Sequence, residues 1–144
     1  MTRKLIIASA IVAAIMGASA PAMANSVFIE QYGFGNGAGG EQVGVANTIG
    51  VYQDGVWNTT ISKQYGNGNT AATGQHGFNN SSDTWQAGNG NAAGVGQFGA
   101  NHTSVLTQDG NGNVAAGVQV GNGCDASVSQ NGSGNVAAFV QACP

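Results

Sequence analysis

The sequence predicts an all-β protein, an amyloid-like two-sheet β-solenoid whose layers are 22-residue strand-turn-strand units made of two 11-residue half-repeats. Three observations lead to this prediction. Glutamine recurs every eleven residues along most of the 144-residue chain. Glycine stands two residues after nearly every one of these glutamines, and asparagine stands five residues after most of them. A fixed short period of this kind is typical of stacked repeats, in which each unit packs on its neighbours.

The repeat has three regular columns, which we name by their residue type. The Gln column contains Gln31, Gln42, Gln53, Gln64, Gln75, Gln86, Gln97, Gln108, Gln119, Gln130 and Gln141. The glycine column contains Gly33, Gly44, Gly55, Gly66, Gly77, Gly88, Gly99, Gly110, Gly121 and Gly132. The Asn column contains Asn36, Asn47, Asn58, Asn69, Asn80, Asn91, Asn113 and Asn135. His102 and Cys124 interrupt the Asn column, and Asn25 falls in its register.

The first element that we expect is a bacterial secretory signal peptide over residues 1–24. Arg3 and Lys4 provide a positive start, an apolar run extends from Leu5 to Gly17, and Ala22-Met23-Ala24 has the form of a cleavage site. The apolar run is too short to cross a bilayer as a helix. Cleavage would leave residues 25–144 as a single repeat domain with no membrane span.

Strands follow, and each is expected to run from an Asn-column position to the next glutamine. The expected strands are 25–31, 36–42, 47–53, 58–64, 69–75, 80–86, 91–97, 102–108, 113–119, 124–130 and 135–141. Because alternate residues of a strand share a face, the Asn and Gln columns point to the same side, with small or apolar residues between them. The four residues after each glutamine form the turn, in which glycine allows positive φ. An eleven-residue period also occurs in right-handed helical coils, but the regular glycines disfavour helices.

Two such strands facing each other across a narrow core would make one layer. Each glutamine would then lie above the glutamine 22 residues earlier. Stacked amide side chains can donate and accept hydrogen bonds along the stacking axis, and such ladders stabilise cross-β structure. At the two ends of the stack, unpaired amides and bare strand edges require another chain.

The stretch QYGNGNTAATGQ, residues 64–75, resembles the curlin repeat, whose pattern is Gln-x-Gly-x-x-Asn-x-Ala-x-x-x-Gln. The same pattern starts again at Gln86, Gln108 and Gln130, and the resemblance covers Asn25–Gln141. It implies a major-curlin-like, secreted structural subunit of extracellular curli amyloid fibres on the bacterial surface. Such subunits assemble by templated stacking of β-layers and serve adhesion and biofilm matrix. The partners it implies are further copies of the same chain, a nucleator subunit and an outer-membrane export channel.

Two departures from the family pattern keep the role within the fibre open. The major subunit of the family has a glycine-rich leader before its repeats, whereas here the repeats begin at Asn25. The nucleator of the family ends in a basic repeat, whereas this chain ends in Gln-Ala-Cys-Pro. A minor or nucleator subunit therefore remains the alternative to the major subunit.

The charge pattern argues against several other functions. After signal removal, Lys63 is the only lysine or arginine, and it stands against six acidic residues, which gives a net charge of −5. Nucleic acid is therefore a poor partner. An ice-binding solenoid would need regular outward threonine rows, which the sequence lacks. We expect no enzyme activity, catalytic residue, metal site or cofactor, because turns this short leave no loop to build a catalytic cleft.

Cys124 and Cys143 are the only cysteines. Because exported proteins meet an oxidising compartment, we expect a disulfide that clamps the last layer. Free thiols and an intermolecular bridge are the alternatives.

Overall fold

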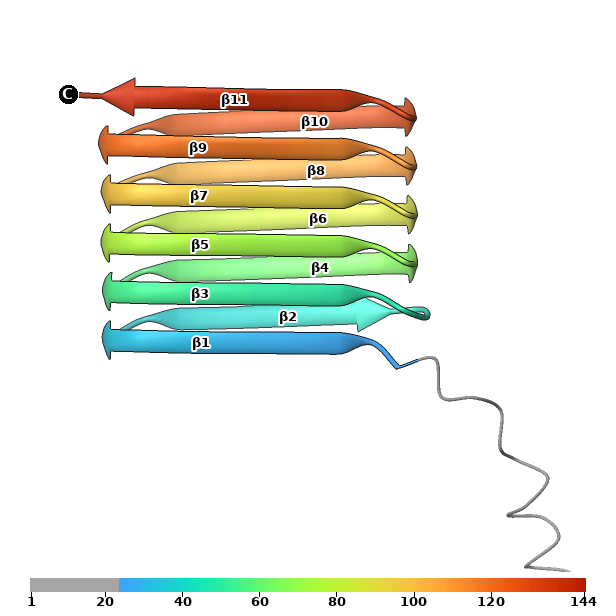
Figure 1. Cartoon of the computed structure of the whole chain (residues 1–144), viewed down its shortest axis with the longest axis horizontal. Coiled ribbons are helices and arrows are strands. Elements are labelled where there is room, and N and C mark those ends of the chain that lie inside the picture. Colours follow the sequence, from blue (N-terminus) through green and yellow to red (C-terminus); the bar gives the residue numbers. More distant parts are fainter. Residues whose placement is uncertain (1–23) are drawn as a thin grey trace, which may run out of the picture.

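A computed structural model describes residues 24–144 as a regular stack of eleven strands (Figure 1). The fold predicted from the sequence, a two-sheet β-solenoid, is confirmed. The predicted signal peptide, residues 1–24, lies outside the described residues except for its last position. No helix in residues 24–144 is long and apolar enough to cross a membrane.

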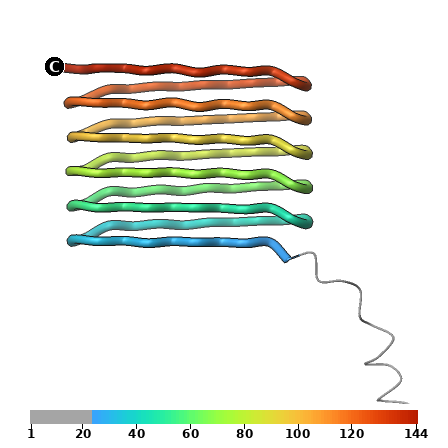
Figure 2. The backbone as a smooth tube through the Cα atoms, viewed as in Figure 1, coloured from blue at the N-terminus to red at the C-terminus, as the bar shows by residue number. Residues whose placement is uncertain are grey.

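The strands alternate between the two sheets as the chain proceeds. Their bounds are β1 (Ser26–Phe34), β2 (Gly37–Val43), β3 (Thr48–Val56), β4 (Thr59–Asn67), β5 (Thr70–Phe78), β6 (Ser81–Asn89), β7 (Ala92–Ala100), β8 (Thr103–Asn111), β9 (Val114–Asn122), β10 (Asp125–Ser133) and β11 (Val136–Cys143). Sheet A has six strands in the order β1-β3-β5-β7-β9-β11, and sheet B has five in the order β2-β4-β6-β8-β10. The tube trace in Figure 2 shows the chain moving from one sheet to the other at every corner.

All pairing is parallel, and each residue pairs with the one 22 positions along the chain, as Gln53 does with Gln75. Positions 22 residues apart in a column therefore lie directly above one another. Two residues that are 22 positions apart in the sequence therefore lie in adjacent layers, about 4.8 Å apart as in other hydrogen-bonded strands.

The strand ends differ from the prediction. A typical strand begins one residue after the Asn column and continues three residues past the glutamine, as β5 does from Thr70 to Phe78. The predicted four-residue turn is therefore wrong, because parallel pairing between layers continues through the glycine column. Only two residues separate most strands, such as Asn79 and Asn80 between β5 and β6.

The glycine column lies where adjacent layers approach most closely. Gly55 has φ of 132°, and a Cβ placed on it would overlap the carbonyl oxygen of Gly77 in the next layer. Two independent constraints therefore require glycine here: the left-handed conformation and the lack of space between layers.

The interior is narrow and mostly polar. Its apolar part forms two small clusters, one around Ile49, Val51 and Ala71 and the other around Leu106 and Val95. Between and beside these clusters lie the buried amides of the Gln and Asn columns. Since a buried amide without a partner costs about 1–3 kcal/mol, the hydrogen bonds of these columns determine whether the stack is stable.

Candidate functional site: amide columns and the two ends of the stack

The Gln column forms a continuous hydrogen-bonded ladder within each sheet. Gln53 donates from Nε2 to Oε1 of Gln75 at 2.7 Å, and Gln75 donates in the same way to Gln97 at 2.7 Å. The ladder of sheet B is equivalent, with Gln64 donating to Gln86 at 2.8 Å. The amides from Gln53 to Gln119 are fully buried. Every donated bond points toward the C-terminal end of the stack, so the ladder has a direction.

From Gln42 onward, the second amide hydrogen of each glutamine in the column bonds to the opposite sheet. Gln75 Nε2 also donates to the carbonyl oxygen of Thr59 at 3.0 Å, and Gln86 does the same with Thr70 at 3.0 Å. One side chain thus joins two layers and two sheets. This explains why glutamine, with two donor hydrogens and an acceptor on a long side chain, suits the position.

The Asn column is bonded differently from the ladder expected for it. Asn47 accepts at Oδ1 from the backbone N–H of Asn69 at 3.0 Å and donates from Nδ2 to the carbonyl oxygen of Gly66 at 2.8 Å. Most of its members thus bond to the backbone of the next layer rather than to each other's side chains. The Asn column thereby caps the corners, where the backbone leaves one strand for the next.

His102 and Cys124 occupy consecutive layers of one Asn column, above Asn80. The backbone N–H of Cys124 donates to Nδ1 of His102 at 3.1 Å, so the ring nitrogen replaces the missing amide oxygen. His102 Nε2 lies 3.2 Å from the carbonyl oxygen of Phe98, which fits a neutral ring protonated on Nε2. His102 is 1% exposed and therefore acts as a structural substitute for asparagine.

Cys124 and Cys143 form a disulfide with an S–S distance of 2.00 Å and a Cα–Cα distance of 5.6 Å. Cys143 pairs with Gly121 at the end of β11, and Cys124 lies at the corner between β9 and β10. The bridge therefore fastens the last strand to the layer beneath it.

The two ends of the stack present complementary groups. At the N-terminal end, Gln31 and Gln42 donate inward to the stack, and no described residue donates to their Oε1 atoms. At the C-terminal end, Gln130 and Gln141 accept at Oε1, and their Nε2 groups bond to backbone oxygens with no glutamine above them. One end thus offers amide acceptors and the other offers amide donors.

Backbone N–H groups at the C-terminal end are also donors without a partner in the described chain. The first residue of each lower strand donates its N–H to the layer above, as Thr103 does to the oxygen of Cys124 and Val114 to that of Asn135, both at 2.8 Å. The equivalent N–H groups of Asp125 and Val136 have no acceptor among residues 24–144. Edge groups of this kind are a template for another strand.

Inward-pointing apolar residues are uncovered at the N-terminal end. Val27 is 51% exposed and Ile29 is 41% exposed, although Ile49 and Val51 directly above them are buried. These side chains occupy core positions, and they are exposed only because β1 has a neighbour on one side.

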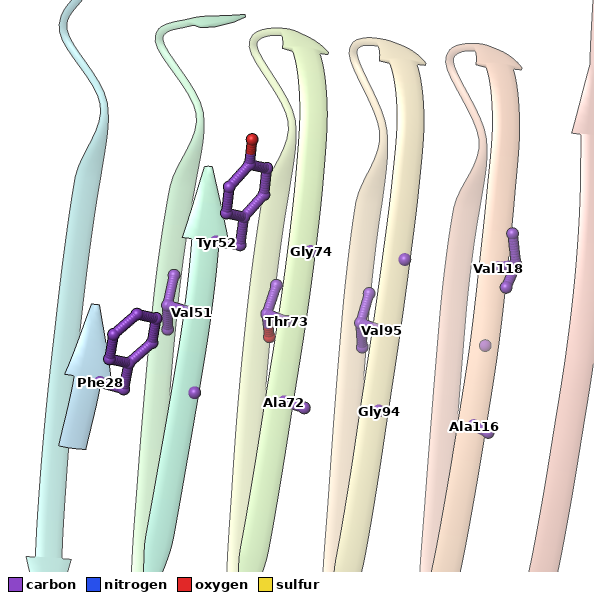
Figure 3. Close-up of a pocket in the computed structure, with 13 residues that line it drawn as sticks. Phe28, Val51, Tyr52, Ala72, Thr73, Gly74, Gly94, Val95, Ala116 and Val118 are labelled. Atoms are coloured by element: carbon purple, nitrogen blue, oxygen red, sulfur yellow. The ribbon is translucent and has the colours of Figure 1, made fainter. Parts of the chain in front are cut away.

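The outer faces of the two sheets have different chemistry. Along sheet A a shallow groove follows the stacking axis across small residues such as Ala72, Gly94 and Ala116, with Phe28 and Tyr52 at one end (Figure 3). Sheet B is more polar and carries most of the charged residues of the described chain, namely Glu41, Lys63, Asp83, Asp109 and Asp125.

Exposed side chains also contact one another on both sheets and at the corners, where Asn67 donates to Asn89 at 3.0 Å. On sheet B, Lys63 Nζ lies 5.9 Å from the ring centre of Trp85, whose ring contacts Tyr65 at 4.8 Å between centres. A hydrogen bond to Glu41 raises the pKa of Tyr65. On sheet A, His76 Nδ1 lies 3.2 Å from Asp54. Among the residues that the structure describes, no three His, Cys, Asp or Glu side chains converge as metal ligands would.

Sequence reasoning missed the second residue of each corner. Four non-glycine residues adopt positive φ, namely Ala46, Trp57, Asn79 and Asn101. All stand four residues after a glutamine, where most other repeats have glycine. The positive φ of this position could have been predicted from the glycines that the other repeats have there.

Comparison with known protein families agrees with this geometry. The model of the curlin associated repeat matches residues 44–77, 66–99 and 77–110, and successive matches begin at multiples of the eleven-residue period. A search of curated proteins finds no significant match to the chain. The matched segments contain the Gln, glycine and Asn columns that build the stack. Residues 44–110 therefore carry curlin associated repeats, which supports the assignment of the chain to the curlin repeat family.

Proposed function

We propose that this protein is a secreted structural subunit of extracellular curli-like amyloid fibres. In this proposal, residues 1–24 direct export and are removed, and residues 25–144 assemble by stacking on one another for adhesion and biofilm matrix. Export through an outer-membrane channel and initiation on a nucleator subunit belong to the same proposal. The curlin repeat family is one of structural amyloid subunits, which supports a structural role over a catalytic one.

The observation that carries the proposal is the complementarity of the two ends. Gln130 and Gln141 offer Nε2 donors, and Gln31 and Gln42 offer Oε1 acceptors. Joining one end of a copy to the opposite end of another would extend each ladder without a break. Such a head-to-tail contact does not close on itself, and therefore generates an open filament.

Backbone edges favour the same contact. The unpaired N–H groups of Asp125 and Val136 would find carbonyl acceptors in an added layer, as equivalent groups do inside the stack. Val27 and Ile29 would become buried in the same step. Apolar burial contributes about 25 cal/mol per Å² of area removed from water, so these two side chains favour assembly.

The proposal predicts the behaviour of proline at the C-terminal edge. In the Asp125→Pro, Val136→Pro variant, each proline removes an N–H that nothing within residues 24–144 accepts. Proline is tolerated at the first residue of a strand, so the monomer should fold with its disulfide formed. We expect seeded growth at the C-terminal end to stop, because two backbone bonds and the space for the next layer are lost.

The measurement is dye fluorescence together with electron microscopy of the purified 25–144 chain, alone and with sonicated wild-type fibrils. Asp125→Ala, Val136→Ala is the matched control, since it keeps both N–H groups and should grow like wild type. A wild-type chain that stays monomeric at high concentration in the presence of seeds would contradict the proposed function.

The same assay tests the nucleator alternative. A major subunit should show a long lag that seeds abolish. A nucleator should assemble without a lag and should shorten the lag of a separate major subunit.

A further inference from the structure

We infer that successive copies in the fibre are rotated by a half turn about the stacking axis, so that β1 of each copy pairs with β10 of the copy before it. The inference rests on the proposed function and on removal of residues 1–24. It follows from the odd number of strands, six in sheet A and five in sheet B.

The strand order determines which positions the next copy can occupy. Each strand pairs with the second strand along the chain, so the position above β10 lies in sheet B and the next position, above β11, lies in sheet A. A new copy that fills these positions in order places its β1 in sheet B and its β2 in sheet A. In the copy beneath, β1 belongs to sheet A, so the new copy is turned by half a revolution.

The alternative is a copy added without rotation, with its β1 on β11. That arrangement skips the position above β10. The N–H of Asp125 and the Nε2 group of Gln130 would then face an empty position within the fibre. Buried groups of this kind are nearly always satisfied in stable proteins, so the unrotated junction is disfavoured.

The column of core residues two positions before each glutamine supports the half turn independently. This inward column has glycine only at Gly40 and Gly117, and its bulkiest member is Phe139. Phe139 pairs with Gly117 in the layer beneath, and a Cβ on Gly117 would overlap the Phe139 ring. Glycine there provides the space for the aromatic ring.

In the half-turn junction the residue directly above Phe139 is Gly40 of the next copy, because β2 lies on β11 in the same register. The largest side chain of the column would then lie between its only two glycines. Without rotation, the next copy would place Ile29 above Phe139, and two bulky side chains would meet. Within its own chain, a Cβ on Gly40 would lie 3.2 Å from Cδ1 of Ile49, and the junction would add Phe139 as a second neighbour that favours glycine.

Other pairs at the half-turn junction are also compatible. Ile29 would cover Val128, Gln31 would continue the ladder from Gln130, and Gly33 would lie over Gly132, as each column requires. Glu30 would lie over Ser129 rather than over another acid. The junction would therefore repeat the pairing rules seen inside the chain.

The half turn has a consequence for the fibre surface. Each side of the fibre would show the small-residue groove of sheet A and the acidic face of sheet B in alternation. No side would be apolar along its whole length, which would limit the lateral association of fibres through sheet A.

Helical symmetry of the fibre, measured by cryo-electron microscopy, is the first test. Eleven half-layers give a rise of about 26 Å per copy with a rotation close to 180°. The unrotated arrangement gives about 29 Å per copy and no half turn. Fibres with the second set of parameters would overturn the inference and leave the proposed function intact, whereas the absence of fibres would contradict the function itself.

Cross-linking is the second test and does not depend on image quality. In fibres of the Glu30→Cys, Ser129→Cys variant, the two new thiols should lie one layer apart and react with a short thiol-specific linker to give dimers and higher multimers. In the Glu30→Cys, Val140→Cys variant they should not. Cross-linking of the second variant but not the first would overturn the half turn. All three sites face outward, so the monomer fold is preserved.

The Phe139–Gly40 contact has a test of its own. Gly40→Val should slow growth on wild-type seeds at least tenfold, and Gly39→Val, which points outward into open space, should not. Adding Phe139→Ala to Gly40→Val should restore growth on seeds made from the same double variant, in which the ring is absent from the end that receives the next copy. A second substitution that restores nothing, while circular dichroism shows both variants folded, would contradict the contact.

Discussion

At each corner of the stack two residues have positive φ, but only one of them must be glycine. The position two residues after glutamine lies against the carbonyl of the next layer and has no room for a side chain, as Gly77 shows. The position four residues after glutamine faces open space at Gly68 and Gly90, and Trp57 and Asn79 occupy it in other repeats. A left-handed residue other than glycine costs about 1–2 kcal/mol, which the stack tolerates where no clash is added.

Two members of the glycine column, Gly110 and Gly132, should behave differently, because a further layer of the same chain lies above Gly110 only. Gly110→Ala should prevent folding, because its Cβ would overlap the oxygen of Gly132. Gly132→Ala should fold with a loss of about 1–3 kcal/mol, since its φ of 107° is strained for alanine but its Cβ would meet only Asn135 at 3.6 Å. It should nevertheless block growth at the C-terminal end. Circular dichroism and seeded growth separate the two effects, and equal folding of both variants would refute the argument.

His102 gives a second prediction at the residue scale. His102→Ala removes the acceptor for the buried N–H of Cys124 and should lower the free energy of unfolding by about 1–3 kcal/mol. His102→Asn restores the amide of the column and should be close to wild type. Urea denaturation of freshly prepared monomer measures both variants. A His102→Asn variant as unstable as His102→Ala would show that the ring has a role beyond accepting this bond.

At the scale of elements, the strands differ in how they are held. Interior strands such as β5 are paired on both sides, whereas β1 and β11 are paired on one side only. The two edge strands of sheet A are also unequal, because only β11 is fastened by a disulfide. The C-terminal edge is therefore kept in the shape that the next copy must match.

Removal of the bridge should loosen β11 more than any other strand. In the chain-entropy model a loop of this size, with a sequence separation of 19, contributes about 3 kcal/mol. In the Cys124→Ala, Cys143→Ala variant we expect hydrogen exchange to increase most over Val136–Cys143 and less in β5 and β7. Uniformly faster exchange throughout the stack would mean that the disulfide holds the whole fold.

For the whole molecule, the arrangement of charge is compatible with stacking. No acidic residue pairs with another in an adjacent layer; Asp54 pairs with Tyr32 and His76, and Asp83 pairs with Ile61 and Val105. Most of the acids lie on sheet B, so the net negative charge is concentrated on one face. Repulsion between monomers that approach through this face should delay assembly.

We therefore expect the Asp83→Asn, Asp109→Asn variant to assemble after a shorter lag, with elongation on seeds little changed. Kinetics followed by dye fluorescence at low salt provide the measurement. Added salt should shorten the wild-type lag toward that of the variant, because it screens the same charges. An unchanged lag for the variant would rule out this role of the aspartates.

Much of the structure was predictable because a stacked repeat converts sequence period into spatial period. The full Gln column, of which Gln53, Gln64 and Gln75 are members, predicted the number of strands and the 22-residue layer, and the Asn column in the same register predicted the inward face. The strand ends, the bonding of Asn47 to backbone and the substitution of His102 for an amide were decided only in the tertiary structure. These features depend on which backbone atom lies directly above a side chain, and a one-dimensional pattern contains no information on the path of the chain through the corner.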